Sequence, residues 1–334
     1  MKREIIKQNV GVDVSKDDIK VALSILSTDY RVSVCSTRTF FNTTKGFELL
    51  LSWLKSKIEL GLPVHFTLEA TGVYYENLAY FLYEQDFSLH VILPVYGKKY
   101  AQSLGIKSKT DKLDARTLAQ MGLERELRLW QPISPVLLEL KQLTRERDAL
   151  ICNRTVVSNH LHAYRHQGKP NNECIARSVK HITFMDEQIK QIEKEISLLV
   201  NRNENLKNRI KYLLSIPGVG LLTASIIVAE TNGFAAFESI KQLTSYAGLD
   251  IRIAESGNWK GKSKISKRGN SHIRKALFMP SLSKIKYDQE TKQFYDRLKE
   301  KKSIGMVATI AVERKLLGLM LSLWKKQEMF RLVS

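Results

Sequence analysis

The chain has 334 residues, 43% of them hydrophobic and 26% charged, a composition that excludes a largely disordered or collagen-like protein. Its 53 lysines and arginines outnumber its 34 acidic residues, and the formal net charge of +19 favours a polyanionic partner. No apolar run approaches the roughly 18–20 residues of a membrane span, and three widely spaced cysteines do not support a disulfide framework. We therefore expect a cytoplasmic protein with no membrane partner.

Residues 1–130 alternate between strand-like and helix-like patterns. Runs rich in β-branched residues predict strands, and apolar residues at helical spacing predict helices. The predicted strands are Gln8–Ser15, Ile19–Leu26, Arg31–Phe40, Val64–Ala70 and Leu89–Leu93, and the predicted helices are Lys45–Ile58, Tyr74–Gln85 and Leu113–Leu123. Three strands in a meander followed by βαβα units indicate an α/β domain with a mixed sheet.

Four carboxylates in this domain stand where strands or helices begin or end. Asp13 interrupts the apolar first strand, where a charge is costly unless it is paired or binds a cation. Glu69 ends a later strand, and Asp111 and Asp114 lie three apart at a helix start, so both can point to one side. Two Mg²⁺ ions require such hard oxygen ligands, and ions about 3.5–4 Å apart can stabilise both the attacking and the leaving oxygen at a phosphorus.

Each acid also has an ordinary explanation. Asp111 could cap a helix, Asp114 could be a first-turn acid that the helix dipole favours, and Glu69 could face solvent. Asp13 is harder to explain in this way, because valines flank it in a strand that should be central. A strand beginning Gly-Val-Asp also opens actin-like and sugar-kinase ATPases, but the further glycine-rich phosphate loops that those enzymes need are missing from the sequence.

Residues 131–211 have a helical and polar pattern. Leu137–Tyr164 predicts one long helix, Gly168–Asn172 predicts a turn, and a second long helix follows. Apolar residues of the second helix repeat at the spacing of a coiled-coil seam, with Asn203 as one polar seat. The seam runs through Met185, Ile189, Ile192, Ile196, Leu199, Leu206, Ile210 and Leu213. The two helices predict a hairpin arm, which either packs within one chain or joins a homo-oligomer, a dimer or a tetramer.

Residues 212–334 form a third predicted part, which is mostly helical. An apolar helix end, the turn Pro217–Gly220 and a helix with small residues are typical of a helix-hairpin-helix motif. Backbone N–H groups at its glycine-rich turn, around Gly218 and Gly220, could bind a phosphate without reading base sequence. A plain tight turn between packed helices is the alternative.

The positive charge is concentrated in this last part. From Ile251 to the end there are 20 basic and 7 acidic residues, and no acidic residue stands between Ser256 and Tyr287. A face that only improves solubility normally mixes both signs, so the segment predicts contact with nucleic acid. The residues expected to bind are Lys260, Lys262, Lys264, Lys267, Arg268, Arg274 and Lys275.

Ser256 lies beside this basic run in a glycine-flanked segment. Nearby cations would offset the charge of a phosphorane if its hydroxyl attacked a phosphodiester. No histidine stands nearby to serve as its base, and composition alone makes Ser256 an ordinary loop residue. The residues around Ser256 therefore do not by themselves identify it as a nucleophile.

Taken in order, these features resemble the DEDD-type insertion-sequence transposases related to the Piv invertase. The resemblance covers nearly the whole chain and rests on the four acids, the helical arm, the Ile216–Gly220 hairpin and Glu255–Gly257. Three local strings also match, namely Glu69–Gly72, Lys109–Arg116 and Ser245–Leu249.

The resemblance implies a fold and a chemistry. It implies a RuvC-like domain of the ribonuclease H fold over residues 1–130, in which the acids bind Mg²⁺, for which Mn²⁺ could substitute. The metal ligands would be Asp13, Glu69, Asp111 and Asp114. It also implies a C-terminal transposase domain over residues 212–334, in which Ser256 attacks a phosphate of double-stranded DNA and forms a phosphoserine link. Strand exchange would pass through a Holliday-type junction.

The same resemblance implies partners. A structured non-coding RNA of the element, the bridge RNA, would pair with donor and target DNA, and such pairing would supply the sequence specificity. A neighbouring subunit, joined through the arm, would bring Ser256 to the metals. The protein would be a nucleoid-associated recombinase of a prokaryote.

Two other functions fit parts of the sequence. A Holliday-junction-resolvase-like nuclease would use the same acids with water as its nucleophile and would not need Ser256. A non-catalytic nucleic-acid-binding protein would use the acids only as helix caps and strand ends, and its binding would not depend on a metal.

Overall fold

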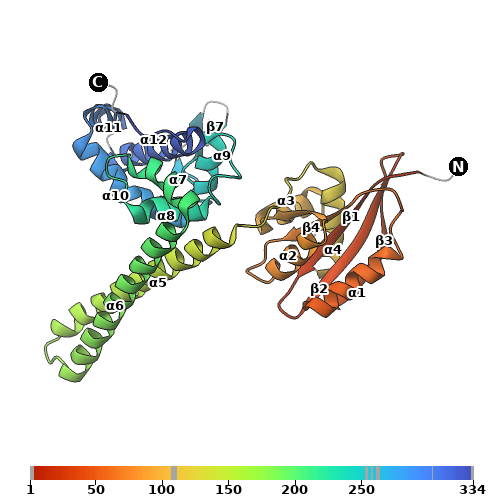
Figure 1. Ribbon diagram of the computed structural model, residues 1–334, viewed down its shortest axis with the longest axis horizontal. Helices are drawn as coiled ribbons and strands as arrows, with labels where there is room; N and C mark the ends of the chain where they lie inside the picture. Colours follow the sequence, from red (N-terminus) through yellow and green to blue (C-terminus); the bar gives the residue numbers. More distant parts are fainter. Residues whose placement is uncertain are drawn as a thin grey trace. The chain divides into compact units, whose positions relative to one another are not determined.

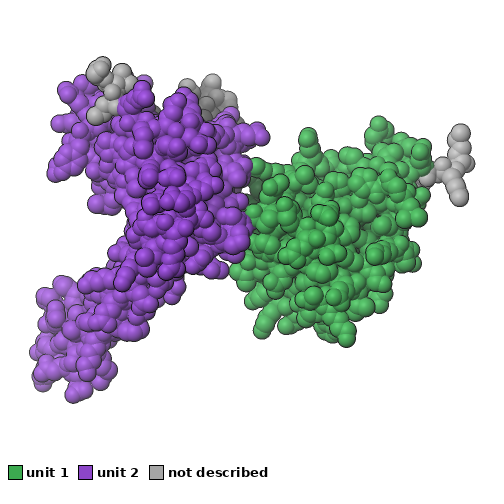
Figure 2. Space-filling view, viewed as in Figure 1, with its two compact units in different colours: residues 1–132 green, residues 133–334 purple. Residues whose placement is uncertain are grey.

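The computed structural model describes residues 4–106, 111–252, 255–256, 259–260, 264–302 and 304–331. The chain divides into two compact units, Met1–Pro132 and Ile133–Ser334 (Figure 2). The finer division of the second unit into an arm and a separate C-terminal domain stays a prediction.

The first unit is built on a mixed five-stranded sheet (Figure 1). The strands are β1 (Ile5–Val14), β2 (Asp18–Ser27), β3 (Val32–Phe41), β4 (Val64–Glu69) and β5 (Ser88–Ile92), in the spatial order β3-β2-β1-β4-β5. β1 runs antiparallel to β2 and parallel to β4, because the first three strands form a meander and the chain then crosses over through a helix. The predicted strands and mixed sheet are confirmed, and the sheet is consistent with the ribonuclease H fold.

The described helices of this unit are α1 (Thr44–Lys55), α2 (Glu76–Glu84), α3 (Pro94–Ser103) and α4 (Asp111–Glu124). Helices α1, α2 and α4 confirm the three predicted helices. Helix α3 is absent from the sequence prediction, which takes Pro94 only as the end of a strand. Pro94 instead begins the helix, where its fixed φ suits the first turn and its missing N–H is not needed.

Strand β1 divides its side chains between the two faces of the sheet. Its apolar residues belong to a buried core formed with α1 and α2, which contains Val10, Val12, Val14, Phe47, Leu50 and Leu78. Asn9 points to the opposite face, because its amide donates to the carbonyl of Ala119 in α4 (3.0 Å). Since residues two apart on a strand share a face, Gly11 and Asp13 also lie on the α4 face.

The second unit begins with the expected pair of long helices. α5 (Pro135–Arg165) and α6 (Asn172–Arg202) run side by side and antiparallel (Figure 1). The ion pairs Arg147–Glu193 and Arg154–Asp186 join them, and their opposite progression along the two helices reflects the antiparallel direction. Whether this hairpin has coiled-coil geometry and joins subunits stays a prediction.

Asn203 does not occupy a seat in a continuous helical seam. It ends α6 and caps the next helix, α7 (Glu204–Leu214), where its side chain accepts a hydrogen bond from the N–H of Leu206 (2.9 Å). Asparagine favours this position because its short side chain satisfies a free N–H at a helix start. The predicted polar seat is therefore wrong, and the apolar repeat is divided between two helices.

The rest of the second unit is mostly helical, as predicted. Its described elements are α8 (Leu221–Glu230), α9 (Ile240–Ala247), β6 (Ile251–Arg252), β7 (Glu255–Ser256), β8 (Trp259–Lys260), β9 (Lys264–Ile265), α10 (Ser271–Tyr287), α11 (Gln289–Lys302) and α12 (Gly305–Lys326). The arm and these helices share one buried core, which includes Leu140 of α5, Ile196 of α6 and Leu316 of α12. Within the ranges that the structure describes, no helix combines the length and the hydropathy needed to cross a membrane.

Candidate functional site

Asp13 is the next-to-last residue of β1, and Glu69 is the last residue of the neighbouring parallel strand β4. The register of β1 and β4 finishes at the pair Val12–Leu68, and each acid is the next residue of its strand. Glu69 shares a face with Thr67, whose hydroxyl accepts a hydrogen bond from the Asn9 amide (3.0 Å). Because Asn9 and Asp13 share that face, the two half-buried carboxylates lie on one face at one edge of the sheet.

Helix α4 approaches this face closely because β1 carries a glycine at the contact. A Cβ atom at Gly11 would lie 2.1 Å from the carbonyl oxygen of Ala115, a distance that no side chain tolerates. Asn9, two residues earlier in the strand, contacts Ala119, one turn later in the helix. The helix therefore runs antiparallel to β1, and its first turn lies toward Asp13.

Two further groups complete this edge of the first unit. Asp114 belongs to the first turn of α4 and is half-buried. Helix α3 lies against Glu69, since a Cβ atom at Gly97 would be 2.9 Å from the Glu69 Oε2 atom. The Thr71 hydroxyl donates to the Glu69 Oε1 atom (3.4 Å). The fold thus brings Asp13, Glu69 and Asp114 to the same edge.

Asp111 is the first residue of α4, but its side chain lies outside the described residues. Among the side chains that are described, no group of three or more histidine, cysteine, aspartate or glutamate residues is arranged to hold a metal ion. The donor chemistry nevertheless fits Mg²⁺, because carboxylate oxygens on strand ends and a helix start are the hard ligands that this ion prefers. The site residues predicted in this unit stay predictions as metal ligands.

A cleft adjoins Asp13 on the α4 face of the sheet. Lys20 of β2 is in register with Asp13 on one side and with Thr39 of β3 on the other. The cleft is lined by Lys20, Val21, Thr37, Arg38, Thr39 and Ala115. Lys20 lies 3.8 Å from the carboxylate of Asp18, whereas the Arg38 guanidinium lies over the Phe40 ring (5.3 Å), on the opposite face of the sheet. The Lys20 ammonium and the Thr39 hydroxyl, on the same face as Asp13, could bind a phosphate there.

Ser256 lies on a short β-hairpin in the second unit. β7 and β8 pair antiparallel, with Glu255 opposite Lys260 and Ser256 opposite Trp259. The glycine- and lysine-rich sequence predicts a loop here, because strands of only two residues are too short to produce a recognisable strand pattern. The side chain of Ser256 lies outside the described residues, so its predicted role as nucleophile is not tested.

Five of the predicted basic residues lie in or just after this hairpin. The side chains of Lys260, Lys262 and Lys264 lie outside the described residues. Lys267 and Arg268 are described and exposed, so both can meet a polyanion. Their contact with nucleic acid stays a prediction.

The other two predicted basic residues have partners within the protein. The Arg274 guanidinium donates to the carbonyls of Ala247 (2.7 Å) and Gly269 (3.2 Å). The Lys275 ammonium lies 3.2 Å from both carboxylate oxygens of Asp148, and this hydrogen bonding raises the pKa of Lys275. Both residues therefore have structural partners beside any role in binding.

The glycine-rich turn connects α7 and α8. Gly218 has a φ of +87°, and a Cβ atom there would lie 2.9 Å from the hydroxyl oxygen of Ser283 in α10. Gly220 precedes the first turn of α8, and among the described atoms a Cβ at this position would meet only open space. Gly218 is thus needed for the close packing of the turn against α10, and the helix-hairpin-helix function stays a prediction.

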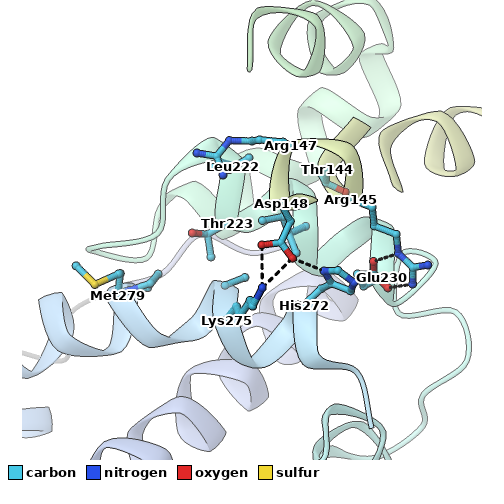
Figure 3. Close-up of a pocket in the computed structure, with 13 residues that line it drawn as sticks. Thr144, Arg145, Arg147, Asp148, Leu222, Thr223, Glu230, His272, Lys275 and Met279 are labelled. Carbon is cyan, nitrogen blue, oxygen red and sulfur yellow. Dashed lines mark hydrogen bonds and ion pairs between the residues drawn. The ribbon is translucent and has the colours of Figure 1, made fainter. Parts of the chain in front are cut away.

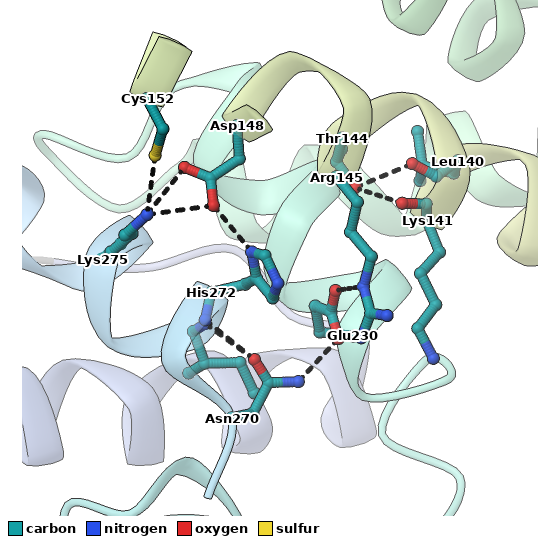
Figure 4. A network of polar contacts seen from close by, with 11 residues as sticks. Leu140, Lys141, Thr144, Arg145, Asp148, Cys152, Glu230, Asn270, His272 and Lys275 are labelled. Atoms are coloured by element: carbon teal, nitrogen blue, oxygen red, sulfur yellow. Dashed lines mark hydrogen bonds and ion pairs between the residues drawn. The ribbon is translucent and has the colours of Figure 1, made fainter. Parts of the chain in front are cut away.

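The second unit contains a polar network that the sequence patterns do not predict (Figure 4). Glu230 ends α8 with only 3% of its surface exposed, and its carboxylate accepts hydrogen bonds from Arg145 of α5 (2.7 and 2.9 Å) and from Asn270 (2.6 Å). Burial alone would raise the pKa of Glu230, but these hydrogen bonds hold it below its ordinary value. A single acid at the end of the apolar run Leu221–Glu230 is the signal that could have found it.

A pocket adjoins this network, between α5, α8 and α10 (Figure 3). Its polar side includes Asp148, whose carboxylate accepts a hydrogen bond from the His272 ring (2.8 Å). Its apolar side includes Leu222 and the exposed Met279. The charged groups on its walls all have partners in the protein: Arg145 pairs with Glu230, Asp148 with Lys275, and Arg147 with Glu193 of α6 outside the pocket. This pairing suits a role in holding helices together.

Two family models match stretches of this chain. A DEDD transposase model of IS110 elements matches residues 10–168, and a model described as "Transposase IS116/IS110/IS902 family" matches residues 210–296. The second match lies within the second unit, and helix α6 lies between the two matched stretches.

Proteins similar over long stretches carry related descriptions. The pilin gene-inverting protein of Moraxella bovis is 31% identical over 323 residues, which cover 93% of this chain and 94% of that protein. The transposase for insertion sequence element IS1111A of Coxiella burnetii is 25% identical, with 72% of each chain covered. The transposase for insertion sequence element IS1328 of Yersinia enterocolitica is 24% identical, with 56% of this chain and 61% of that protein covered. The chain therefore belongs to the IS110 family of transposases.

Proposed function

We propose that this protein is a site-specific DNA recombinase that cleaves and rejoins strands with a serine nucleophile and divalent metal ions. The observation that supports this most is the shared edge of the sheet at which Asp13, Glu69 and the first turn of α4 meet. Family membership and relatives described as transposases and as an inverting protein support DNA as the substrate.

The acids of the first unit would hold the metal ions. Asp13, Glu69, Asp111 and Asp114 would supply the carboxylate oxygens for Mg²⁺, or for Mn²⁺ in its place. Bound there, the ions would offset the charge that develops on the phosphate during the reaction. Gly11 contributes by allowing α4 to bring its first turn to the strand ends.

Ser256 would carry out the exchange of phosphate esters. Its Oγ atom would form a bond to phosphorus, the bond to one deoxyribose oxygen would break, and that oxygen would leave as a hydroxyl. A carboxylate at the metal edge would take the serine proton, because no histidine stands next to Ser256 in the sequence. Attack by a new deoxyribose hydroxyl would reverse the step. Each exchange conserves the number of ester bonds, so no energy-rich cofactor is needed.

The hairpin around Ser256 and the residues after it would bind nucleic acid. Exposed Lys267 and Arg268 would contact phosphates, with Lys260, Lys262 and Lys264 from the same segment. Such contacts position a strand but carry no sequence information. A structured bridge RNA paired with the DNA would therefore supply specificity, and subunits joined by the α5–α6 arm would combine a serine from one copy with acids from another.

The test is strand cleavage on the element's native flanking DNA, with the protein expressed together with those flanks so that any guide RNA is present. Wild type should give an SDS-resistant protein–DNA adduct that needs Mg²⁺, and Ser256→Ala should give none. Ser263→Ala, which alters another serine of the same segment, should react like wild type.

A water-dependent nuclease would use the same carboxylate edge. It would nick DNA in Mg²⁺ equally well with Ser256→Ala and would leave no adduct. Salt-sensitive binding without metal-dependent cleavage would instead identify a non-catalytic nucleic-acid-binding protein.

A further inference from the structure

We propose that Glu230 is a positioning residue that ties the arm helix α5 to the base of the segment that carries Ser256. This inference rests on the proposed role of Ser256. The buried network of Figure 4 would then serve the reaction, because it joins three parts of the second unit that lie far apart in the sequence: α5, α8 and the start of α10.

The first connection runs from the arm to α8. The Nε and Nη2 atoms of Arg145 lie 2.7 and 2.9 Å from the two carboxylate oxygens of Glu230, a two-point contact that fixes both position and orientation. The Glu230 side chain is fully buried, whereas that of Arg145 is 48% exposed. A buried carboxylate without this partner would be costly, so α5 and α8 are held together firmly.

The second connection runs from Glu230 to the point where the serine-bearing segment re-enters the helices. The Asn270 amide donates to Glu230 (2.6 Å). The Asn270 Oδ1 atom in turn accepts from the N–H groups of His272 (3.0 Å) and Ile273 (3.2 Å), and so caps α10. One side chain therefore fixes the start of α10 and binds Glu230 at the same time.

The other end of the segment is tied to the same residues. The Asn270 N–H donates to the carbonyl of Tyr246 near the end of α9 (2.8 Å), and the Tyr246 hydroxyl donates to the carbonyl of Glu230 (3.1 Å). A Cβ atom at Gly269 would lie 2.3 Å from the Tyr246 carbonyl oxygen, so glycine is needed for this close approach. Both ends of the segment thus meet at Glu230.

Further contacts close the base of the segment into a narrow neck. The N–H of Lys267 donates to the carbonyl of Gly248 (3.1 Å), and the N–H of Ser266 donates to the carbonyl of Asp250 (2.9 Å). Arg274 adds hydrogen bonds to the carbonyls of Ala247 and Gly269, on the two sides of the neck. A displacement of the neck would therefore be passed to the hairpin that it supports.

A second contact from the same arm helix reinforces the first. Asp148 lies one turn after Arg145 on α5 and binds His272 and Lys275, which lie one turn apart on α10 (Figures 3 and 4). Two successive turns of α5 are thus attached to α8 and to the first turns of α10. The orientation of the arm and that of the serine-bearing hairpin are coupled through these contacts.

The test compares Glu230→Gln with Asp186→Asn in the full-length protein. Glu230→Gln keeps the shape of the side chain and removes the charge that binds Arg145. Asp186→Asn removes the charge from another two-point arginine contact, Arg154–Asp186, which joins α5 to α6 away from the neck. We expect Glu230→Gln to form the adduct about tenfold more slowly or worse, with DNA affinity within about twofold of wild type. Asp186→Asn should keep the wild-type rate.

Trypsin gives a direct readout of the serine-bearing segment between α9 and α10, because Lys260, Lys262, Lys264, Lys267 and Arg268 are cleavage sites in its sequence. Glu230→Gln should be cut there several-fold faster than wild type, with unchanged resistance in α12. Arg145→Lys, which keeps the charge but cannot make the two-point interaction, should lie between wild type and Glu230→Gln in both assays. This graded response would not follow from a general loss of stability.

The outcomes separate the inference from the proposed function. If wild type forms the adduct and Glu230→Gln forms it at the same rate with unchanged cleavage by trypsin, the positioning role is overturned. If wild type forms no adduct although it cleaves DNA, the serine mechanism fails, and faster trypsin cleavage of Glu230→Gln would still establish the structural link. If Glu230→Gln does not fold, Arg145→Lys and Arg145→Gln decide the matter, since the half-exposed Arg145 side chain tolerates replacement better.

Discussion

Asp13 and Glu69 follow directly on the register pair Val12–Leu68, so that two carboxylates lie at the same level near the ends of adjacent parallel strands. Two residues before Asp13, Gly11 leaves room for α4, whose first turn carries Asp114. The proximity of the acids is thus a property of the fold: strand direction, strand order and one glycine determine it, and residues far apart in the sequence meet as a result.

Replacement of Asp13 tests the proposed metal edge. Asp13→Asn keeps the size of the side chain but removes the charge that a divalent cation needs, so cleavage in Mg²⁺ should fall by at least about a hundredfold. The measurement is single-turnover cleavage of the flanking DNA at saturating protein. Glu48→Gln, which removes an exposed acid on α1, should keep the wild-type rate. Normal cleavage by Asp13→Asn would remove this residue from the metal set.

The close approach at Gly11 predicts a loss of stability on adding a single methyl group. In Gly11→Ala the new Cβ would collide with backbone atoms of Ala115 and Ala119, which cannot move without shifting α4. The free energy of unfolding should therefore fall by about 3 kcal/mol, as for an overpacked core. Gly168→Ala, at a position open to solvent among the described atoms, is the matched control and should change stability little. Urea denaturation measures both, and equal midpoints for the two variants would rule out the close packing.

Burial raises the pKa of Glu313 in α12 to about 7, although the charge of Arg274 opposes the change. The folded protein therefore binds this proton more tightly than the unfolded chain does, where the ordinary value is 4.5. Protonation of Glu313 therefore stabilises the folded protein, by about 3 kcal/mol in total. This contribution is complete below pH 4.5 and is lost as the pH rises through about 7.

Glu313→Gln imitates the protonated side chain and should remove this pH dependence. Above about pH 7 the variant should be more stable than wild type, and below about pH 4.5 the two should converge. Denaturation midpoints measured across this range check the prediction, with Glu328→Gln as the exposed control. Parallel profiles for wild type and Glu313→Gln would contradict it.

Exposed Lys267 and Arg268 should contribute to the salt dependence of nucleic-acid binding. Lys267 has a φ of +51°, so Lys267→Asn removes the charge with a residue that tolerates this conformation. Together with Arg268→Gln it should reduce the slope of log affinity against log salt by about 0.9 for each phosphate of duplex DNA that the protein no longer neutralises. Lys55→Gln on α1 should leave the slope unchanged, and an unchanged slope for the double variant would place both residues off the nucleic acid.

The sequence predicted the elements of the first unit well, because its strands alternate or run apolar and its helices have clear apolar faces. The prediction also identified the acids at strand ends, since a charge such as Asp13 within an apolar strand is a strong local signal. It missed α3, because Pro94 is equally compatible with the end of a strand and with the first turn of a helix. It misplaced Asn203, because a seam position and a helix cap have the same local sequence.

The network around Glu230 shows what local patterns cannot supply. Arg145, Glu230 and Asn270 are separated by 85 and 40 residues, and no periodicity relates them. Charge alone groups Arg274 and Lys275 with the other cations, whereas the packing of α10 against α5 and α9 gives them partners in the protein. Side-chain partners of this kind follow from tertiary packing, which composition and local spacing do not reveal.

The most direct test of the serine mechanism is to locate the DNA on the protein. The adduct from wild type would be digested with nuclease and trypsin, and the peptide that retains a nucleotide would be sequenced by mass spectrometry. The serine mechanism predicts a nucleotide linked to Ser256 in the tryptic peptide Ile253–Lys260. A nucleotide on any other residue, or cleaved DNA with no modified peptide, would contradict it.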